Sequence, residues 1–536
     1  MNIAFDPWIP VVTMEGKSRL ASLNEVFSDG EHFSDLAVRP HERVSLMRLF
    51  LCVAYAALNG PKDYAEWCKL PNVLGKAASK YLEDWKDSFE LFHPTKPWLQ
   101  VAALDVLSTE NDYENDEDKG WSPLRSICYT KARGINPTLF DHSANSSGLE
   151  EYREEEIVLN LISFQNFFVA GGKASSRLWS KNKMINPANP KGGPCSGKSI
   201  LFAFIRNKNL IETIISNLNS YDDLKIIYGN QRNSIGRPIW EYPITNPIDE
   251  SAIQNATKTH LGRLVPQTRI LRLNEDRKRV LLGAGFLYPK FQDDKNPFAP
   301  DIFATVRANK NDKIELVSVR PDKAIWRELH SISIYRSADS TNARGPLCLK
   351  NVPDNEYCDL VIDAMVTNPK LAAEIVGLVE SVFVIPPRMR KEEGNNSYMD
   401  EVKKAESIAS KLGWAIEGYR EEIDGGWKGR LESAGAGKGE LKAKLRFAGS
   451  NYYWTSVEKN LSLLMAHIKA IGTDEAMPTQ EVWRKMLFST ACEAYKTACG
   501  QETPRQIKAF AKGWQRLTST KEEVDNGKEN IKEDEE

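Results

Sequence analysis

The sequence predicts an α+β protein with a large irregular mixed α/β N-terminal domain followed by a C-terminal four-helix bundle. In the N-terminal part, short β-rich runs alternate irregularly with long polar loops that are rich in proline and glycine, which argues against a doubly wound sheet. From about residue 395, apolar residues instead recur every three or four positions, which indicates long amphipathic helices. We therefore expect domains at 1–390 and 395–517 and an acidic disordered tail at 518–536.

The N-terminal domain begins with a strand and a buried helix. The stretch FDPWIPVV favours a strand interrupted by Pro7 and Pro10. The apolar stretch at 43–58 predicts a helix that ends at Asn59-Gly60-Pro61, and its apolar surface on nearly all sides indicates that the helix is buried. Further β-rich runs are expected at 157–164, 199–205, 280–282, 302–306 and 314–319.

Four amphipathic helices in succession predict the C-terminal bundle. The first has apolar steps from Val402 to Tyr419, and the second has them from Trp454 to Ile468. The third helix is expected at about 478–498. The fourth begins at Thr503-Pro504, because a threonine N-cap followed by a first-turn proline is typical of a helix start. The glycine-rich stretch at 425–440 is interpreted as a flexible connection between the first two helices.

The composition is typical of a soluble globular protein, with 41% hydrophobic and 27% charged residues in 536. No run approaches the length of a membrane span, and the N-terminus has neither a basic leader nor a small-residue cleavage site, so we expect a cytoplasmic protein without a membrane partner. The eight cysteines show no CxxC pair and the seven histidines are scattered singly. We therefore expect no metal site, no cofactor and no disulfide framework.

Charge is distributed unevenly although the formal net charge is only −2. The tail at 521–536 holds eight acidic residues against three lysines, and 105–119 holds seven against one, which is typical of solvated, disordered segments. By contrast, 157–211 contains no Asp or Glu. This stretch is either a phosphate-binding footprint or a basic loop that acidic groups elsewhere in the fold offset. Its phosphate-binding candidates are Lys173, Arg177, Lys181, Lys183, Lys191 and Lys198.

The segment KGGPCSGKS within this stretch satisfies the Walker A pattern, with Gly192, four residues, and then Gly197-Lys198-Ser199. A P-loop needs a buried strand before it and a helix after it. The preceding NPANP cannot form a central strand, and the following SILFAFI predicts a strand instead of a helix. We interpret the match as fortuitous and keep a P-loop-like nucleotide hydrolase as the enzymatic alternative. The same backbone and lysines suit nucleic-acid phosphates.

Four features, in this order along the chain, resemble the large-subunit (CasA) family of the type I-E CRISPR Cascade surveillance complex. They are FDPWIPV followed by RLASLNEVF, FQNFFVAGG at 164–172, GFLYPKF at 285–291, and the C-terminal bundle, so the resemblance spans about 1–517. It implies a non-catalytic subunit that reads the protospacer-adjacent motif, helps to start strand separation, and holds the displaced strand. The implied partners are double-stranded target DNA, CRISPR RNA, the other Cascade subunits and a recruited helicase-nuclease.

The resemblance also assigns residues to DNA reading. Gly171 and Gly172 match the glycine loop of the family, where a missing Cβ lets the main chain approach the floor of the minor groove. Lys290 matches the lysine finger, which would donate to acceptors on the base edges. The wedge that separates the first base pairs falls at a turn where this chain lacks the glutamine of some relatives. The wedge candidates are Asn368, Pro369 and Lys370.

Two further segments correspond to functional parts of the family. The loop Phe140, Asp141 and His142 falls where relatives dock onto the complex near the 5′ end of the guide. Some relatives carry a cysteine-rich, zinc-like cluster before the lysine finger, whereas 267–284 has no cysteine here. Its basic residues either extend the basic surface or belong to a solvated strand pair. These residues are Arg269, Arg272, Arg277, Lys278 and Arg279, with Arg263 just upstream.

Two alternatives to a Cascade subunit remain besides the P-loop hydrolase. For a metal-dependent nuclease, spacing shows no compact ligand set, because the sequence has no HxH, HExxH or HD pair, and the alternative left open is a cluster of carboxylates that are distant in sequence. A stand-alone DNA-binding protein would bind DNA tightly alone, whereas a Cascade subunit is expected to bind DNA weakly until it is assembled.

Overall fold

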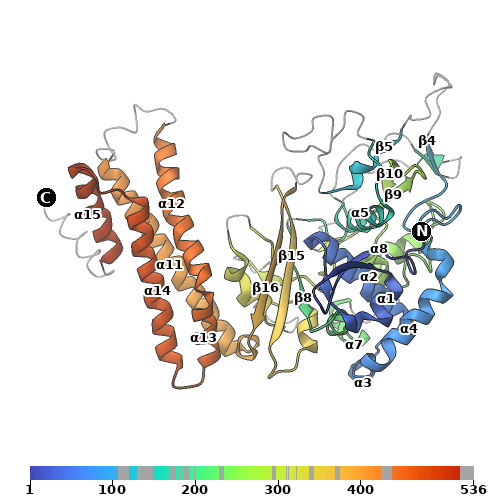
Figure 1. Ribbon diagram of the computed structural model, residues 1–536, viewed down its shortest axis with the longest axis horizontal. Coiled ribbons are helices and arrows are strands. Elements are labelled where there is room, and N and C mark those ends of the chain that lie inside the picture. Colours follow the sequence, from blue (N-terminus) through green and yellow to red (C-terminus); the bar gives the residue numbers. More distant parts are fainter. Residues whose placement is uncertain are drawn as a thin grey trace. The chain divides into compact units, whose positions relative to one another are not determined.

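The computed structural model describes the chain in two compact units, Met1–Ile385 and Pro386–Glu536, which we call the first and the second unit (Figure 1). Short antiparallel strands and helices mix in the first unit, and helices alone make up the described part of the second, so the α+β prediction is confirmed. The described residues are 1–106, 120–129, 149–168, 177–179, 183–184, 192–197, 199–228, 235–291, 297–309, 311, 313–320, 323–336, 343–368, 375–423 and 437–519.

Helix α2 (Pro40–Leu58) lies at the centre of the first unit, where α4, α5 and α9 pack against it (Figure 1). Every residue from His41 to Tyr55 is buried, because apolar side chains occupy all faces of the helix. This confirms the buried helix expected at 43–58. The other helices of this unit are α1 (Leu23–Ser28), α3 (Tyr64–Trp67), α4 (Leu70–Asp84), α5 (Glu154–Phe167), α6 (Leu210–Asn217), α7 (Tyr221–Tyr228), α8 (Glu250–Lys258), α9 (His260–Leu264) and α10 (Leu329–Ile332).

Helix α5 corrects the sequence prediction of a β-rich run at 157–164. The run is rich in β-branched residues, but it is also apolar on all sides, and periodicity alone cannot distinguish a buried helix from a buried strand. Its start carries three acidic residues in the first turn, Glu154, Glu155 and Glu156, where the helix dipole favours negative charge. That signal was available in the sequence.

The sheet that matters most for the candidate site has the order β16-β15-β8 and is antiparallel throughout. Strand β15 (Cys358–Thr367) pairs with β8 (Phe202–Arg206) on one side and with β16 (Ile375–Ile385) on the other. Strands β15 and β16 thus form a long hairpin, which Figure 1 shows beside β8. The strand expected at 199–205 is confirmed in its main part, whereas β16 was not predicted.

Smaller sheets complete the first unit, with the orders β2-β1-β3, β5-β10-β9 and β4-β6-β7 and the pairs β11-β12 and β13-β14. Only Val306 of the run expected at 302–306 belongs to a strand. The bounds are β1 (Ile9–Thr13), β2 (Ser18–Ala21), β3 (Phe33–Leu36), β4 (Leu104–Val106), β5 (Ser122–Pro123), β6 (Arg177–Trp179), β7 (Lys183–Met184), β9 (Arg269–Leu273), β10 (Arg279–Gly285), β11 (Lys290–Phe291), β12 (Pro297–Phe298), β13 (Val306–Ala308) and β14 (Ile314–Leu316).

The second unit is a helical bundle in which α11 packs against α15, α12 and α14 (Figure 1). The helix expected from Trp454 to Ile468 is divided at Asn460 into α12 and α13. Helix α15 begins at Pro504, and Thr503 caps it by accepting the N–H of Gln506, as the sequence predicted. The bounds are α11 (Glu392–Ile423), α12 (Gly437–Lys459), α13 (Leu461–Ala470), α14 (Ala476–Ala498) and α15 (Pro504–Thr518).

Candidate nucleic-acid interface

The C-terminal end of α5 is fixed by the buried side-chain amide of Gln165 and by the backbone carbonyl of Asn166. Gln165 is 0% exposed and pairs with the backbone of Arg269 on β9, donating to its carbonyl at 2.8 Å and accepting its N–H at 2.8 Å. The backbone carbonyl of Asn166 accepts the N–H of Cys195 at 3.1 Å. The Arg269 guanidinium lies 4.9 Å from the ring centroid of Phe168, the residue that ends the helix. The chain therefore leaves α5 toward residues 169–176 from a defined position.

The segment 192–197 forms a turn that packs against this helix end. The N–H of Gly193 donates to the carbonyl of Phe168 at 2.8 Å, and a Cβ on Gly193 would lie 2.3 Å from the carbonyl oxygen of Asn166. Only glycine fits at so close an approach. The hydroxyl of Ser196 closes the turn by donating to the carbonyl of Gly193 at 2.7 Å.

The P-loop interpretation of this segment is wrong. After Ser199 the chain enters strand β8, where a P-loop would open a helix whose N-terminus holds the phosphates. The hydroxyl of Ser199, which would bind Mg²⁺ in a P-loop, is 3.1 Å from the N–H of Thr367 and accepts its hydrogen bond. The segment is a packing element of the first unit.

Lys290, the lysine-finger candidate, reaches this turn from strand β11. Its ammonium donates to the carbonyl of Ser196 at 3.1 Å and to the hydroxyl of the same residue at 3.3 Å. The preceding Tyr288 is 1% exposed, and its hydroxyl accepts the N–H of Gln267 at 2.9 Å, which anchors the segment. The partly buried Lys290 side chain is therefore held at the edge of the turn.

The same segment also contacts the strand that leads to the wedge candidates. Ser199 has a positive φ of 54°, which is uncommon for a residue other than glycine. Its hydroxyl accepts the N–H of Thr367, the last residue of β15, and its carbonyl accepts the N–H of Val319 at 2.9 Å. Asn368 follows Thr367 directly. The segment from Gly192 to Ser199 thus contacts Phe168 after α5, Lys290 on β11 and Thr367 at the end of β15.

The other candidates are only partly covered by the described residues. Arg177 and Lys183 lie on the neighbouring strands β6 and β7. The remaining phosphate-binding, glycine-loop, wedge and docking candidates lie outside the described residues, and their roles stay predictions. These are Gly171, Gly172, Lys173, Lys181, Lys191, Lys198, Pro369, Lys370, Phe140, Asp141 and His142.

The basic run before Lys290 belongs to a strand pair, β9 and β10. Its most buried residue, Arg269, does not contribute to the surface. Arg269 is 4% exposed and donates to the carbonyl of Gly283. Arg277 pairs with Glu151 at 2.6 Å, and Arg279 pairs with Asp276 at 3.0 Å. An extended basic surface from this run is therefore not supported.

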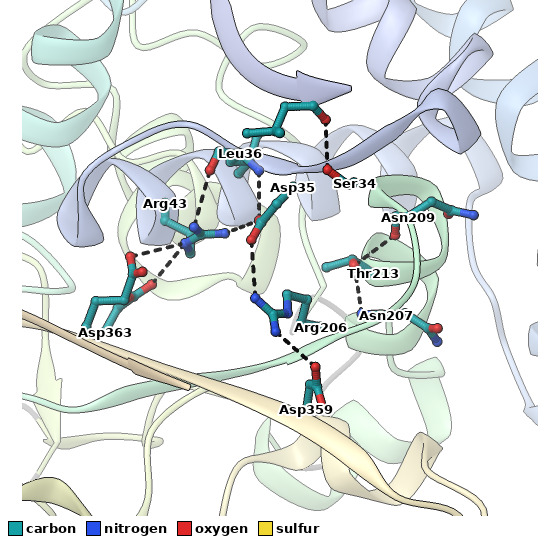
Figure 2. A network of polar contacts seen from close by, with 12 residues as sticks. Ser34, Asp35, Leu36, Arg43, Arg206, Asn207, Asn209, Thr213, Asp359 and Asp363 are labelled. Carbon is teal, nitrogen blue, oxygen red and sulfur yellow. Dashed lines mark hydrogen bonds and ion pairs between the residues drawn. The ribbon is translucent and has the colours of Figure 1, made fainter. Parts of the chain in front are cut away.

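A charged network fixes the β15–β16 hairpin to helix α2 (Figure 2). Arg43 on α2 bonds to Asp35 on β3, and its Nε lies 3.7 Å from a carboxylate oxygen of Asp363 and 3.7 Å from one of Glu380. Burial raises the pKa of the Asp363 carboxyl well above its ordinary range, and Arg43 acts in the opposite direction. Asp363 is 0% exposed, and neither of its oxygens accepts a hydrogen bond from a described residue.

Arg206 extends this network to the outer part of the sheet. Its guanidinium bonds to Asp359 at 3.0 Å and lies 3.6 Å from Asp35, so that β8, β15 and β3 are joined by one cation (Figure 2). The hairpin is thus held at its far end by this network and near its turn by Ser199.

The sequence analysis did not identify Ser196 and Ser199, whose contacts join remote segments at the site. Ser196 and Lys290 are 94 positions apart, and Ser199 and Thr367 are 168 positions apart, so no local pattern connects them. Gln165 lay within a fragment that resembles the family, but its pairing with β9 could not be inferred from that fragment. The one local signal was Gly193, because a glycine in such a turn indicates close backbone approach.

The described part of the chain lacks two classes of feature. Its His, Cys, Asp and Glu side chains form no group of three or more that could hold a metal ion. None of its helices combines the length and apolar character that crossing a bilayer requires. Six of the eight cysteines are buried thiols, and none of the eight forms a disulfide.

The site consists of a backbone turn and a lysine side chain that hydrogen bonds hold in place. The segment is followed by a strand, which distinguishes it from the loop-to-helix arrangement of a P-loop enzyme. Residues 2–494 match the family model described as CRISPR-associated protein Cse1. The chain is 23% identical to the CRISPR-associated protein CasA/Cse1 of Thermus thermophilus, with 96% of each chain covered. This chain belongs to the Cse1 family, so the resemblance to the large-subunit family of type I-E Cascade is confirmed.

Solved structures show the same fold. A crystal structure of Thermus thermophilus CasA matches with a TM-score of 0.71 at 19% identity, covering 96% of this chain and 98% of that one. A chain of a structure titled CRISPR RNA-guided surveillance complex matches with a TM-score of 0.68 at 16% identity, covering 97% and 99%. The architecture is thus shared over nearly the whole length of each chain.

Proposed function

We propose that this chain is the non-catalytic DNA-recognition subunit of a Cascade surveillance complex. It reads the protospacer-adjacent motif in duplex DNA, helps to start strand separation, holds the displaced strand and provides the landing site for the helicase-nuclease. Its partners are double-stranded target DNA, CRISPR RNA and the other Cascade subunits. Membership of the Cse1 family and the match to a chain of a surveillance complex support this assignment.

One observation carries the proposal. The segment 192–199 touches the base of the glycine loop, Lys290 and the strand that precedes the wedge candidates. A minor-groove reader needs close backbone approach, a donor for base-edge acceptors and a group that separates base pairs, all at one place. In this chain Phe168, Lys290 and Thr367 contact this one segment although they are far apart in sequence, and this supports the proposal that the three candidate parts act at one place.

The test is electrophoretic binding of target duplexes to a guide-loaded complex reconstituted with and without this chain. We expect binding to depend on this chain and on the flanking motif, and we expect Gly171→Asp with Lys290→Ala to remove both dependences. Lys17→Ala is the matched control, because Lys17 is an exposed lysine in the turn between β1 and β2. Equal binding without the chain would contradict the proposal, and tight motif-dependent binding by the chain alone would favour a stand-alone DNA-binding protein.

A further inference from the structure

A small cavity inside the first unit is lined by Arg48 on α2, Tyr228 on α7, His260 and Arg263 on α9, and Asp301. It leaves about 10 Å³ for the centre of a water-sized sphere. This is room for one water molecule or one monatomic ion, and a phosphate group is too large for it. We propose that the cavity binds a single halide ion, chloride in the cell, beside Arg48 and Arg263. The site concerns the stability of the first unit and does not depend on the proposed function.

Two cations and one carboxylate line this cavity, so its charged groups carry +2 against −1. Arg48 is 1% exposed, and its guanidinium bonds to the Asp301 carboxylate. Arg48 also donates to the backbone carbonyls of Arg263 at 2.6 Å and of Leu264 at 3.3 Å. The Arg263 guanidinium donates to the carbonyl of Thr257 at 2.9 Å. Because burying charge is unfavourable without an opposite charge nearby, an anion suits this cavity better than a cation or an apolar group.

The pKa values of two lining groups shift in the directions that this balance of charge predicts. Burial lowers the pKa of the Arg263 guanidinium, with Arg48 acting in the same direction and Asp301 against it. For Asp301, burial acts to raise the pKa of the carboxyl, but the charge of Arg48 and its hydrogen bond bring it below its ordinary range. Asp301 is therefore ionised and paired with Arg48. An anion beside Arg263 would stabilise the charged form of its guanidinium.

His260 supplies a further polar group to the cavity wall. The residue is 1% exposed, and its Nδ1 lies 3.2 Å from the hydroxyl oxygen of Tyr228. Its Nε2 is buried and has no hydrogen-bond partner among the described residues. A buried polar atom without a partner costs free energy and points to an ordered water or ion. When the Tyr228 hydroxyl donates to Nδ1, the neutral ring carries its proton on Nε2 and can donate it to an anion.

The cavity joins segments that are far apart in sequence, since α2, α7, α9 and the stretch 299–302 all contribute to its wall. The Asp301 side chain is 18% exposed, which gives the ion a route from solvent on this side. A ligand that binds the folded chain and not the unfolded one stabilises the fold in proportion to the logarithm of its concentration. The stability of the first unit should therefore depend on the halide concentration and not only on ionic strength.

The experiment measures thermal unfolding of the full chain by calorimetry at constant ionic strength, with sodium chloride replaced stepwise by sodium gluconate. Gluconate is also monovalent but is too large for the cavity. We expect the midpoint of the first unit to rise by about 2 °C for each tenfold increase in chloride above its dissociation constant. The midpoint of the second unit should not change. In crystals grown with sodium bromide, an anomalous-scattering peak is expected beside Arg48 and Arg263.

Arg263→Gln tests the cation directly, because it removes one positive charge and keeps an amide near the Thr257 carbonyl. We expect this variant to lose the dependence on chloride. Arg272→Gln is the matched control. Arg272 is likewise partly buried, donates to a backbone carbonyl at 3.2 Å and lies 5.2 Å from the ring centroid of Trp121, much as Arg263 lies 5.9 Å from that of Tyr288. It should keep the chloride dependence of the wild type.

Equal midpoints of the first unit in chloride and in gluconate would overturn the inference and leave the cavity to a water molecule. A chloride dependence that Arg263→Gln keeps in full would also overturn it, because the ion would then bind elsewhere. The wild-type titration and the bromide peak decide the question without a variant, so they hold even if Arg263→Gln does not fold. A crystal with no bromide peak beside Arg48 and Arg263 would count against the site in the same way.

Discussion

At the scale of single residues, Asp363 gives the clearest prediction for pH. Burial raises the pKa of its carboxyl well above 3.8, with Glu380 and Asp35 acting in the same direction and Arg43 against it. The folded state therefore retains a proton that the unfolded state releases, and stability falls as the pH rises from the ordinary carboxyl value through the raised one. Asp363→Asn should flatten this decline between about pH 5 and about pH 8.

Urea unfolding midpoints at the two pH values measure the effect. Asp359→Asn is the matched control, because it removes a half-exposed carboxylate from the same strand and leaves Asp363 in place. An equal pH dependence in wild type and Asp363→Asn would mean that Asp363 is ionised in the folded protein. In that case the pair with Arg43 would outweigh the cost of burial.

At the scale of elements, two glycines in the second unit give predictions of opposite sign. Gly413 lies within α11, and an added Cβ would meet nothing within 4 Å. Gly413→Ala should stabilise the bundle by about 0.5–1 kcal/mol, because alanine loses less backbone entropy in a helix. A gain in the thermal midpoint of the second unit, measured by calorimetry, would confirm this.

Gly513 on α15 should respond in the opposite way. A Cβ there would lie 2.1 Å from the hydroxyl oxygen of Tyr495 and 2.5 Å from the carbonyl oxygen of Ala415 on α11. The tyrosine hydroxyl cannot yield freely, because it donates to the carbonyl of Phe510 at 3.0 Å. Gly513→Ala should therefore cost about 1–3 kcal/mol despite the better helix propensity. A stabilising Gly513→Ala would show that α15 can shift away from α11 without loss.

The elements also show what the sequence can and cannot predict. Helix α2 and the start of α15 were predictable, because a long apolar run and a Thr-Pro cap are local signals. Helix α5 was mistaken for a strand, since a fully buried run carries no periodicity. Strand β16 was missed although it is rich in valine. The positions of Ser196 and Ser199 depend on contacts with remote segments, so only the folded chain could reveal that Lys290 and Thr367 contact the same short segment.

At the scale of the whole molecule, the free energy of unfolding of the first unit includes contributions from buried histidines on different helices. Burial lowers the pKa of His41 on α2 to about 3, with Arg39 acting in the same direction. Burial also lowers the pKa of His260 on α9 to about 3, with Arg48 and Arg263 helping and Asp301 opposing. Both histidines are therefore neutral in the folded unit at any pH above this range.

This arrangement predicts acid destabilisation of the first unit. A histidine with a depressed folded pKa contributes stability above its unfolded value of 6.5, and this contribution is lost as the pH falls toward the folded value. From about pH 6.5 to about pH 5.5, two such histidines should lower the free energy of unfolding by about 2 kcal/mol. Asp363 opposes this trend, so the measurement is made in Asp363→Asn protein, where this opposing carboxyl is absent. Adding His260→Gln, which keeps a polar group beside the Tyr228 hydroxyl, should halve the slope of the free energy of unfolding against pH, measured by urea unfolding.

If His260→Gln leaves this slope unchanged, His260 is accessible to protons in the folded state. The packing between α2 and α9 would then be looser than the structure shows.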